Sequence, residues 1–363
     1  MVHPTIRRNT FVIRVLPFLL LAGGTSVFSG EETSTPAKDS AVAPARPPEL
    51  EAAIEFQRAG KWDEAITRLE ELRKKKLAAE VHATALVELG ESYFAKGKSA
   101  FEGELEGVDP DPLFKKAIGV FEEAVKLHGK IEDPVAYGAY MIGSSNLMLG
   151  DMKAAADAYQ KTYFDYQKTK WGRKALVRLG ISLGAQGETE KAIQIFNAYL
   201  RFHPDEADAE GEKVRDYLSQ LNLVGRSAPG LHADGWMNGT IESLEDLRGD
   251  VVVVVFFATW CNICSRHMPQ LKRQILKWQE KGVAFVGVAN PDDPKSTQPI
   301  ETYVRSKEIP FLDLAFDRRE RSWKTYGVTA LPSVVVIDRK GTIRWRGHMT
   351  FLGNTLLEKL TKE

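Results

Sequence analysis

The chain has 363 residues, too many for one domain of average size and enough for two domains with a leader. Its 49 basic residues balance 49 acidic residues, so composition implies no basic surface that would hold a nucleic acid as a main partner. Hydrophobic residues make up 43% of the sequence, as in globular proteins. The chain has only two cysteines, which excludes a framework of structural disulfides.

Residues 1–30 have the pattern of a secretory signal peptide. The adjacent Arg7 and Arg8 precede an apolar stretch at 15–22, and small residues follow it. This stretch is shorter than the about 18 residues that a membrane span needs, and an uncleaved anchor is the alternative. Residues 31–48 are rich in Ser, Thr, Ala and Pro, which predicts a flexible linker. We therefore expect an exported protein, periplasmic or otherwise extracytoplasmic.

Residues 49–223 contain a repeated pattern of small and large residues at helical spacing. In four places a glycine precedes a segment in which an alanine stands four positions before a large apolar residue. The glycines are Gly60, Gly97, Gly150 and Gly187, and the pairs are Ala65/Leu69, Ala117/Phe121, Ala155/Tyr159 and Ala192/Phe196. These markers resemble tetratricopeptide repeats, in which small residues let two helices approach and large ones fill the groove between them. Each glycine is expected to end the first helix of its unit.

Three further glycines, Gly90, Gly143 and Gly180, stand at matching positions inside the first helices. The second unit departs from the pattern, because an insertion around 103–112 separates its helices. A polar-faced helix at 213–223 is expected to close an array of four helix pairs. Stacked repeats leave an extended groove, which favours binding of a protein or peptide partner. A spacer or a dimerisation element is the alternative.

The most informative stretch begins at Val251. Residues 251–257 form an uninterrupted apolar run of mostly β-branched and aromatic side chains, which predicts a strand buried on both faces of a sheet. Cys261 and Cys264 follow at the start of a segment with helical apolar spacing that extends to Lys281. Because the unpaired N–H groups and the positive dipole end of a helix favour an anion, this placement favours the thiolate that attacks disulfides. The order of strand, Cys-x-x-Cys pair and helix indicates a redox centre.

Several segments together resemble a known family. The run from Phe256 to Cys264 resembles the active-site segment of the thioredoxin superfamily, and more narrowly that of the TlpA/ResA-type thiol-disulfide oxidoreductases. The other matching segments are Gly225-x-x-Ala228-Pro229, Gly239 to Gly249, and Leu331-Pro332 followed by the strand Ser333 to Asp338. The resemblance implies an α/β thioredoxin-like domain over 224–363, with a central mixed sheet and helices on both faces. The expected fold is thus multidomain, an all-α repeat array followed by this domain.

The interval between Cys264 and Pro332 has room for an extra helix and strand, as that family has. These would lie at 295–306 and 311–315. The other expected elements are a hairpin around 234–239, a helical turn at 244–247, a strand at 283–289, a helix at 318–326, an antiparallel pair at 333–338 and 342–346, and a final helix at 351–360.

The placement of the motif residues suggests their roles. Cys261 lies nearer the strand end and is expected to be the nucleophile, and Cys264, one helical turn inward, the resolving thiol. A cis bond before Pro332 would turn the Leu331 backbone toward the sulfurs and leave hydrogen-bonding groups for a substrate peptide. Trp260 is expected to cover the site. The alternatives are a trans turn at Pro332 and a core position for Trp260.

The site departs from the family in three places. The dipeptide between the cysteines is Asn262-Ile263, Val255 stands where thioredoxins bury an aspartate, and His267 stands where TlpA/ResA-type proteins often carry a glutamate. A neutral His267 is the nearest side chain in sequence that could accept the proton of Cys264, and a helix cap or a packing role is the alternative. A zinc site built on the cysteines and His267 would lack its third and fourth ligands, so no metal and no cofactor are expected.

The sequence as a whole predicts an exported thiol-disulfide oxidoreductase, and the resemblance to reductases implies more narrowly a protein disulfide reductase. Its expected partners are a protein substrate with a disulfide or dithiol, a membrane or extracytoplasmic electron donor, and a protein or peptide bound by the repeats. Two other functions stay open. One is a repeat-based scaffold whose thioredoxin-like domain is a docking module, and the other is a thiol peroxidase.

Overall fold

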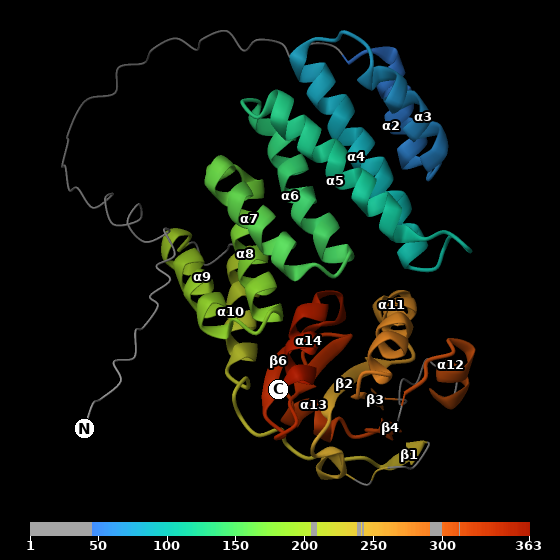
Figure 1. Ribbon diagram of the computed structural model, residues 1–363, viewed down its shortest axis with the longest axis vertical. Helices are drawn as coiled ribbons and strands as arrows, with labels where there is room; N and C mark the ends of the chain where they lie inside the picture. Colours follow the sequence, from blue (N-terminus) through green and yellow to red (C-terminus); the bar gives the residue numbers. More distant parts are fainter. Residues whose placement is uncertain (1–45, 205–208, 238–240, 242, 291–299, 312) are drawn as a thin grey trace, which may run out of the picture. The chain divides into compact units, whose positions relative to one another are not determined.

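The computed structural model describes residues 46–363 with gaps at 205–208, 238–240, 242, 291–299 and 312. The predicted signal peptide and nearly all of the predicted linker lie outside these residues. A helical region comes first and a six-stranded sheet with its own helices follows (Figure 1). Among the described residues, none of the helices is long and apolar enough to cross a membrane.

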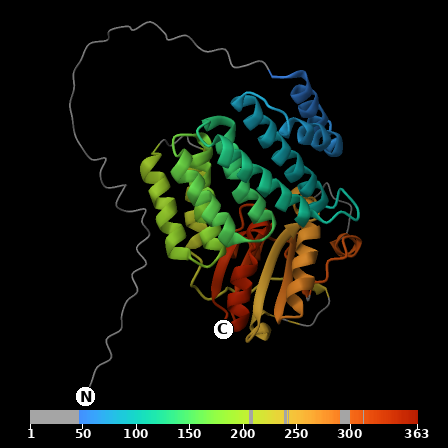
Figure 2. The same ribbon diagram turned by 45° about the horizontal axis from the view of Figure 1, so that its top comes forward.

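The helices of the first region form an array in which each helix packs on the next in sequence (Figures 1 and 2). They are α2 (Pro48–Arg58), α3 (Trp62–Arg73), α4 (Ala79–Phe101), α5 (Pro110–His128), α6 (Glu132–Met148), α7 (Met152–Tyr166), α8 (Lys170–Ala185), α9 (Thr189–Phe202) and α10 (Ala209–Leu221). This confirms the helical repeat region and its closing helix, which begins earlier than expected.

In three helix pairs, a glycine on one helix faces an aromatic ring on the next helix. The glycine lets the two helices pack closely. At each of these glycines an added Cβ would lie 2.5 Å from the nearest ring carbon, closer than two carbon atoms can come. The pairs are Gly90 with Phe121, Gly143 with Tyr159, and Gly180 with Phe196. Since all three rings are almost fully buried, the small residue and the large one together form the recurring core of the array.

The glycines expected to end the first helices are confirmed at three of four places. Gly60, Gly150 and Gly187 follow α2, α6 and α8 with φ values of 71°, 77° and 81°, a conformation that favours glycine. The prediction for Gly97 is wrong. It lies inside α4, where an added Cβ would lie 3.0 Å from the Phe114 ring, and the helix continues to the buried Phe101.

The sheet has the strand order β1-β4-β3-β2-β5-β6. Its strands are β1 (Gly235–Met237), β2 (Val251–Ala258), β3 (Val283–Asn290), β4 (Asp313–Phe316), β5 (Ser333–Ile337) and β6 (Ile343–His348). The fully buried β2 runs parallel to β3 and antiparallel to β5, so the sheet is mixed, as expected. The strand in the expected hairpin, β1, pairs antiparallel with β4 instead, and residues 238–240 of that hairpin lie outside the described residues.

Helices cover both faces of the sheet. They are η1 (Leu244–Leu247), α11 (Asn262–Gln279), α12 (Ile300–Ser306), α13 (Arg321–Thr325), η2 (Met349–Phe351) and α14 (Asn354–Lys362). Neighbouring side chains of a strand point to opposite faces, and Phe256 contacts Tyr326 beside α13 whereas Phe257 contacts Tyr303 of α12. On α11, Trp278 donates from Nε1 to Asn354 Oδ1 of α14 at 3.1 Å, so these two helices lie together.

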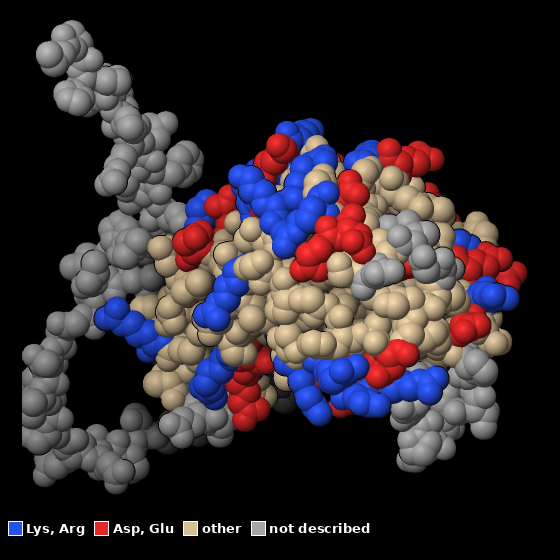
Figure 3. Space-filling view, turned by 90° about the horizontal axis from the view of Figure 1, so that it is seen from below, with Lys and Arg blue, Asp and Glu red and all other residues tan. Residues whose placement is uncertain are grey.

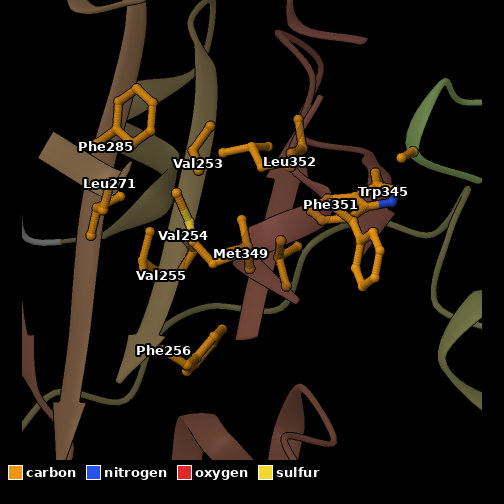
Figure 4. Packing of buried hydrophobic residues seen from close by; sticks show 14 of the residues in the cluster. Val253, Val254, Val255, Phe256, Leu271, Phe285, Trp345, Met349, Phe351 and Leu352 are labelled. Atoms are coloured by element: carbon orange, nitrogen blue, oxygen red, sulfur yellow. The ribbon is translucent and has the colours of Figure 1, made fainter. Parts of the chain in front are cut away.

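The repeat helices and the sheet share one buried cluster. Figure 4 shows a part of this cluster, where the valines of β2 lie near Met349 and Leu352, and Phe351 lies beside Trp345. On the repeat side, Met152 of α7 lies 2.5 Å from where a Cβ would stand at Gly353, and the Arg178 guanidinium of α8 lies 5.3 Å from the Phe351 ring centroid. The predicted domain division at 223/224 therefore falls within continuous packing, and independent folding of the two parts stays a prediction.

The segment at this division is itself bonded to the sheet. Gly225 donates its N–H to Ile343 O at 2.8 Å, Ala228 donates to Gly341 O at 2.9 Å, and Ile343 donates back to Arg226 O at 2.9 Å. These bonds lie at the start of β6, the last strand of the sheet order, on the side that does not pair with β5.

The surface carries charges of both signs. On the face drawn in Figure 3, Lys and Arg side chains lie beside Asp and Glu side chains, with uncharged surface between the groups. Exposed ion pairs such as Lys153 with Asp157 are worth at most about 1 kcal/mol each, so they contribute little to stability.

Gly143→Ala tests the glycine–aromatic contact. The added methyl would overlap the Tyr159 ring, so we expect the free energy of unfolding to fall by about 1–3 kcal/mol. Gly119→Ala is the control, because an added Cβ there meets nothing within 4 Å and alanine favours a helix. Urea unfolding of both variants measures the difference, and equal effects would contradict this account of the repeat core.

Candidate redox site

The two cysteines form a disulfide at the start of α11. Their Cα atoms are 5.2 Å apart. Cys261 is the N-cap residue, and its Sγ accepts the backbone N–H of Cys264 at 3.0 Å. This N–H is one of the donors that a helix leaves unpaired at its first turn. The Cys261 sulfur is thus held where the helix dipole stabilises a thiolate, as the sequence predicted.

The two sulfurs differ in access. Cys264 is fully buried, whereas Cys261 is 9% exposed. Trp260 and Ile263 beside it are each 45% exposed, so apolar surface flanks the accessible sulfur. The alternative that Trp260 is a core residue is therefore wrong. In this arrangement, Cys261 is the sulfur that can first attack a disulfide or be attacked by a thiol.

The loop before β5 lies at the same edge of the sheet. The Leu331–Pro332 peptide bond is cis, as the resemblance implies, so the trans alternative is wrong. β5 begins at Ser333, which pairs with Phe256 close to the end of β2. The half-buried Leu331 therefore lies near the strand end from which the cysteines follow. Its role in binding a substrate backbone stays a prediction.

His267 lies half-buried in the second turn of α11. Its Nδ1 is 3.2 Å from Gln270 Oε1, and the Gln270 amide nitrogen donates to Met349 O at 3.4 Å. This second bond fixes the amide orientation, so Oε1 accepts a proton carried by Nδ1. The tautomer that satisfies both bonds leaves His267 Nε2 as the basic nitrogen. The N-cap residue of α11 is Cys261, so His267 does not cap the helix, and a packing role stays an alternative.

A second histidine packs against the first. The rings of His267 and His348 lie edge to face with centroids 4.9 Å apart. Burial, with smaller contributions from the charges of His267 and Arg178, lowers the pKa of His348 to about 4. Burial also lowers the pKa of His267, although its bond to Gln270 opposes this effect. Both rings are therefore neutral near pH 7, and a neutral imidazole can accept a proton.

The sequence did not indicate the neighbours of His267. Gln270 stands three positions further along α11, so helical spacing could have suggested the contact. His348 follows 81 positions later, at the end of β6, two residues beyond the expected end of that strand. Within the described residues, no group of three or more His, Cys, Asp and Glu side chains could hold a metal ion.

Comparisons with known proteins match both regions. The AhpC/TSA family model matches residues 224–346, and two tetratricopeptide repeat models match residues 50–100 and 174–206. The chain is 30% identical over 120 residues to thiol-disulfide oxidoreductase ResA of Bacillus thuringiensis subsp. konkukian, covering 33% of this chain and 66% of that protein. It is 31% identical over 121 residues to ResA of Geobacillus thermodenitrificans, covering 33% of this chain and 67% of that protein.

Solved structures match the same region. A thiol-disulfide isomerase from Corynebacterium glutamicum is 29% identical with a TM-score of 0.33, covering 38% of this chain and 97% of that chain. The chain spans about two thirds of the length of the two ResA relatives, with coverages of 66% and 67% of those proteins.

His348 predicts a pH dependence of stability. Its pKa is about 4 in the folded chain and about 6.5 when unfolded, so the unfolded state binds more protons between these values. The free energy of unfolding therefore rises with pH across this window, by at most about 1.4 kcal/mol per pH unit from this group. We expect His348→Gln to flatten the rise. Urea unfolding of both proteins at several pH values measures it, and parallel curves would refute the assignment.

Proposed function

Because the chain belongs to the family of ResA-type thiol-disulfide oxidoreductases, we propose that it exchanges disulfides with proteins through Cys261 and Cys264. More narrowly, we propose that it is a protein disulfide reductase. The observation that carries this proposal is the disulfide at the N-terminus of α11, with one sulfur accessible and one fully buried.

The geometry supports a two-step reaction of the reduced protein. The Cys261 thiolate attacks a sulfur of the substrate disulfide, so one substrate thiolate leaves and a mixed disulfide forms. Cys264 then loses its proton and attacks the Cys261 sulfur, which releases the second substrate thiolate and forms the Cys261–Cys264 disulfide. Two electrons pass to the substrate. An external dithiol restores the pair, and we propose a membrane or extracytoplasmic donor for this step.

His267 is the proposed proton acceptor in the second step. It lies one helical turn after Cys264, so the two side chains project from nearly the same side of α11. Its basic Nε2 is the nitrogen that the Gln270 bond leaves available. The proton thus moves from Cys264 Sγ to His267 Nε2 while the sulfur attacks.

The exposed Trp260 and Ile263 are the proposed contact surface for the substrate. A substrate segment can place apolar side chains on them while its backbone bonds to that of Leu331. The proposal thus assigns Pro332 to the loop that presents this backbone.

The repeats are proposed to recruit a protein or peptide. A groove of about 810 Å³ lies between α5, α6 and α7. Apolar residues line it, including Ile118, Val125, Ile142 and Ala158, and so do charged residues of both signs, including Glu122, Lys126 and Asp157. This lining suits a segment with apolar side chains and mixed charge. We propose export through the predicted signal peptide at 1–30 as the route to such partners.

Disulfide reductase activity can be tested directly. We expect the full chain to reduce insulin with dithiothreitol as donor, and we expect Cys261→Ser to fall to the uncatalysed rate, because no other thiol can reach the substrate first. A wild-type chain that is inactive on insulin would favour the scaffold function. Turnover of hydrogen peroxide that depends on Cys261 would favour the thiol peroxidase instead.

Recruitment can be tested by trapping. Cys264→Ala, expressed with the leader, cannot complete the second step, so clients stay linked to Cys261. Adding Ala158→Arg places a long charged side chain in the groove, and we expect at least about a tenfold loss of the trapped clients, the effect of about 1.4 kcal/mol of binding. Ala79→Arg is the control, because Ala79 is exposed and does not line the groove. Identical client profiles in both variants would rule out this groove as the recruitment site.

A further inference from the structure

The end of α4 contacts the helix that carries the cysteines. The Arg273 guanidinium of α11 lies 4.5 Å from the Phe101 ring centroid, and its Nη2 donates to Phe101 O at 3.4 Å. An added Cβ at Gly103 would lie 3.3 Å from Pro269 Cγ, one turn earlier on α11. The repeat array thus lies directly against the redox helix at two successive turns.

Glu102 stands in the sequence between Phe101 and Gly103, the two residues that make these contacts. Its side chain is only 12% exposed, although carboxylates are seldom buried without a compensating interaction. Lys98, one turn back on α4, is 3.7 Å away but is itself half exposed. A loose, partly solvated pair of this kind compensates little of the cost of burying a carboxylate. The position of Glu102 against α11 therefore calls for a second polar partner.

The first two turns of α11 supply such a partner in His267, two positions before Pro269. Burial lowers the pKa of His267, and the bond to Gln270 and then the charge of Glu102 oppose this lowering. The other groups that face His267 oppose Glu102 or are neutral. They are Lys98 of α4, Arg266 of its own helix, and His348 of β6, which has Arg178 of α8 nearby.

We propose that Glu102 is a positioning residue of the redox site, a carboxylate that the repeat array places beside His267 to strengthen it as a proton acceptor. The inference rests on the proposed function for its catalytic consequence. When Cys264 gives its proton to His267 Nε2, the imidazolium that forms is stabilised by the Glu102 carboxylate. The repeats then contribute to the chemistry as well as to recruitment. A client that displaced the end of α4 would also slow the second step.

The coupling can be measured without any catalysis. NMR titration of the oxidised chain gives the pH at the midpoint of His267 protonation. We expect Glu102→Gln, which keeps the shape and removes the charge, to lower it by about 0.5 pH unit or more. Glu104→Gln is the matched control, because Glu104 is exposed on the same segment. Glu102→Asp keeps the charge, so we expect its His267 midpoint to stay closer to that of the wild type. It provides the comparison if the glutamine variant does not fold.

Turnover gives the second readout. One limb of the pH profile of insulin reduction reports the protonation of His267, and we expect it to shift by the same amount as the NMR midpoint. For a shift of 0.5 pH unit, the rate at a fixed pH on that limb changes about threefold. Adding Glu102→Gln to His267→Gln is expected to change nothing further. An unmoved midpoint overturns the proposal whatever the activity. A moved midpoint in a chain that reduces no disulfide keeps the coupling and refutes the proposed function instead.

Discussion

Burial of β2 on both faces is the constraint on which the site depends. An eight-residue strand with only apolar side chains can lie only in the middle of a sheet, between β3 and β5. The chain leaves that strand at one edge and enters α11 within three residues, so Cys261 comes to lie at a helix end. The same edge receives the start of β5 through the Ser333–Phe256 pairing. The accessible sulfur and the cis-proline loop are thus brought together by one strand.

The fold and the cysteine site could be read from the sequence because their signals are local. The apolar run at 251–257, the cysteine spacing and the glycine–alanine markers each act within a few residues. Gly97 shows where that reading fails. It has the spacing of a turn glycine, but burial of Phe101 further along draws the helix past it. Gly97 lies against the Phe114 ring of α5, a contact between two helices that a local pattern does not record.

The surroundings of His267 could not be predicted for the same reason. Gln270 is close in sequence, but His348 packs against the ring from β6, and the charge that opposes the lowering of its pKa by burial comes from Glu102 at the end of α4. Their approach depends on how the repeat array packs on the sheet, through contacts such as Arg178 with Phe351. The sequence indicated that a carboxylate was absent at positions 255 and 267. It carried no information about charges supplied by the other half of the chain.

The bonds between residues 225–228 and β6 have a consequence for association. An edge strand with free N–H and C=O groups is a template for a strand of another molecule. Here the connection from the repeats bonds to the start of β6, where Gly225 and Arg226 pair with Ile343. At the opposite edge, β1 is a strand of three residues, too short to hold an added strand firmly. The connection from the repeats therefore hinders the addition of a strand at the start of β6.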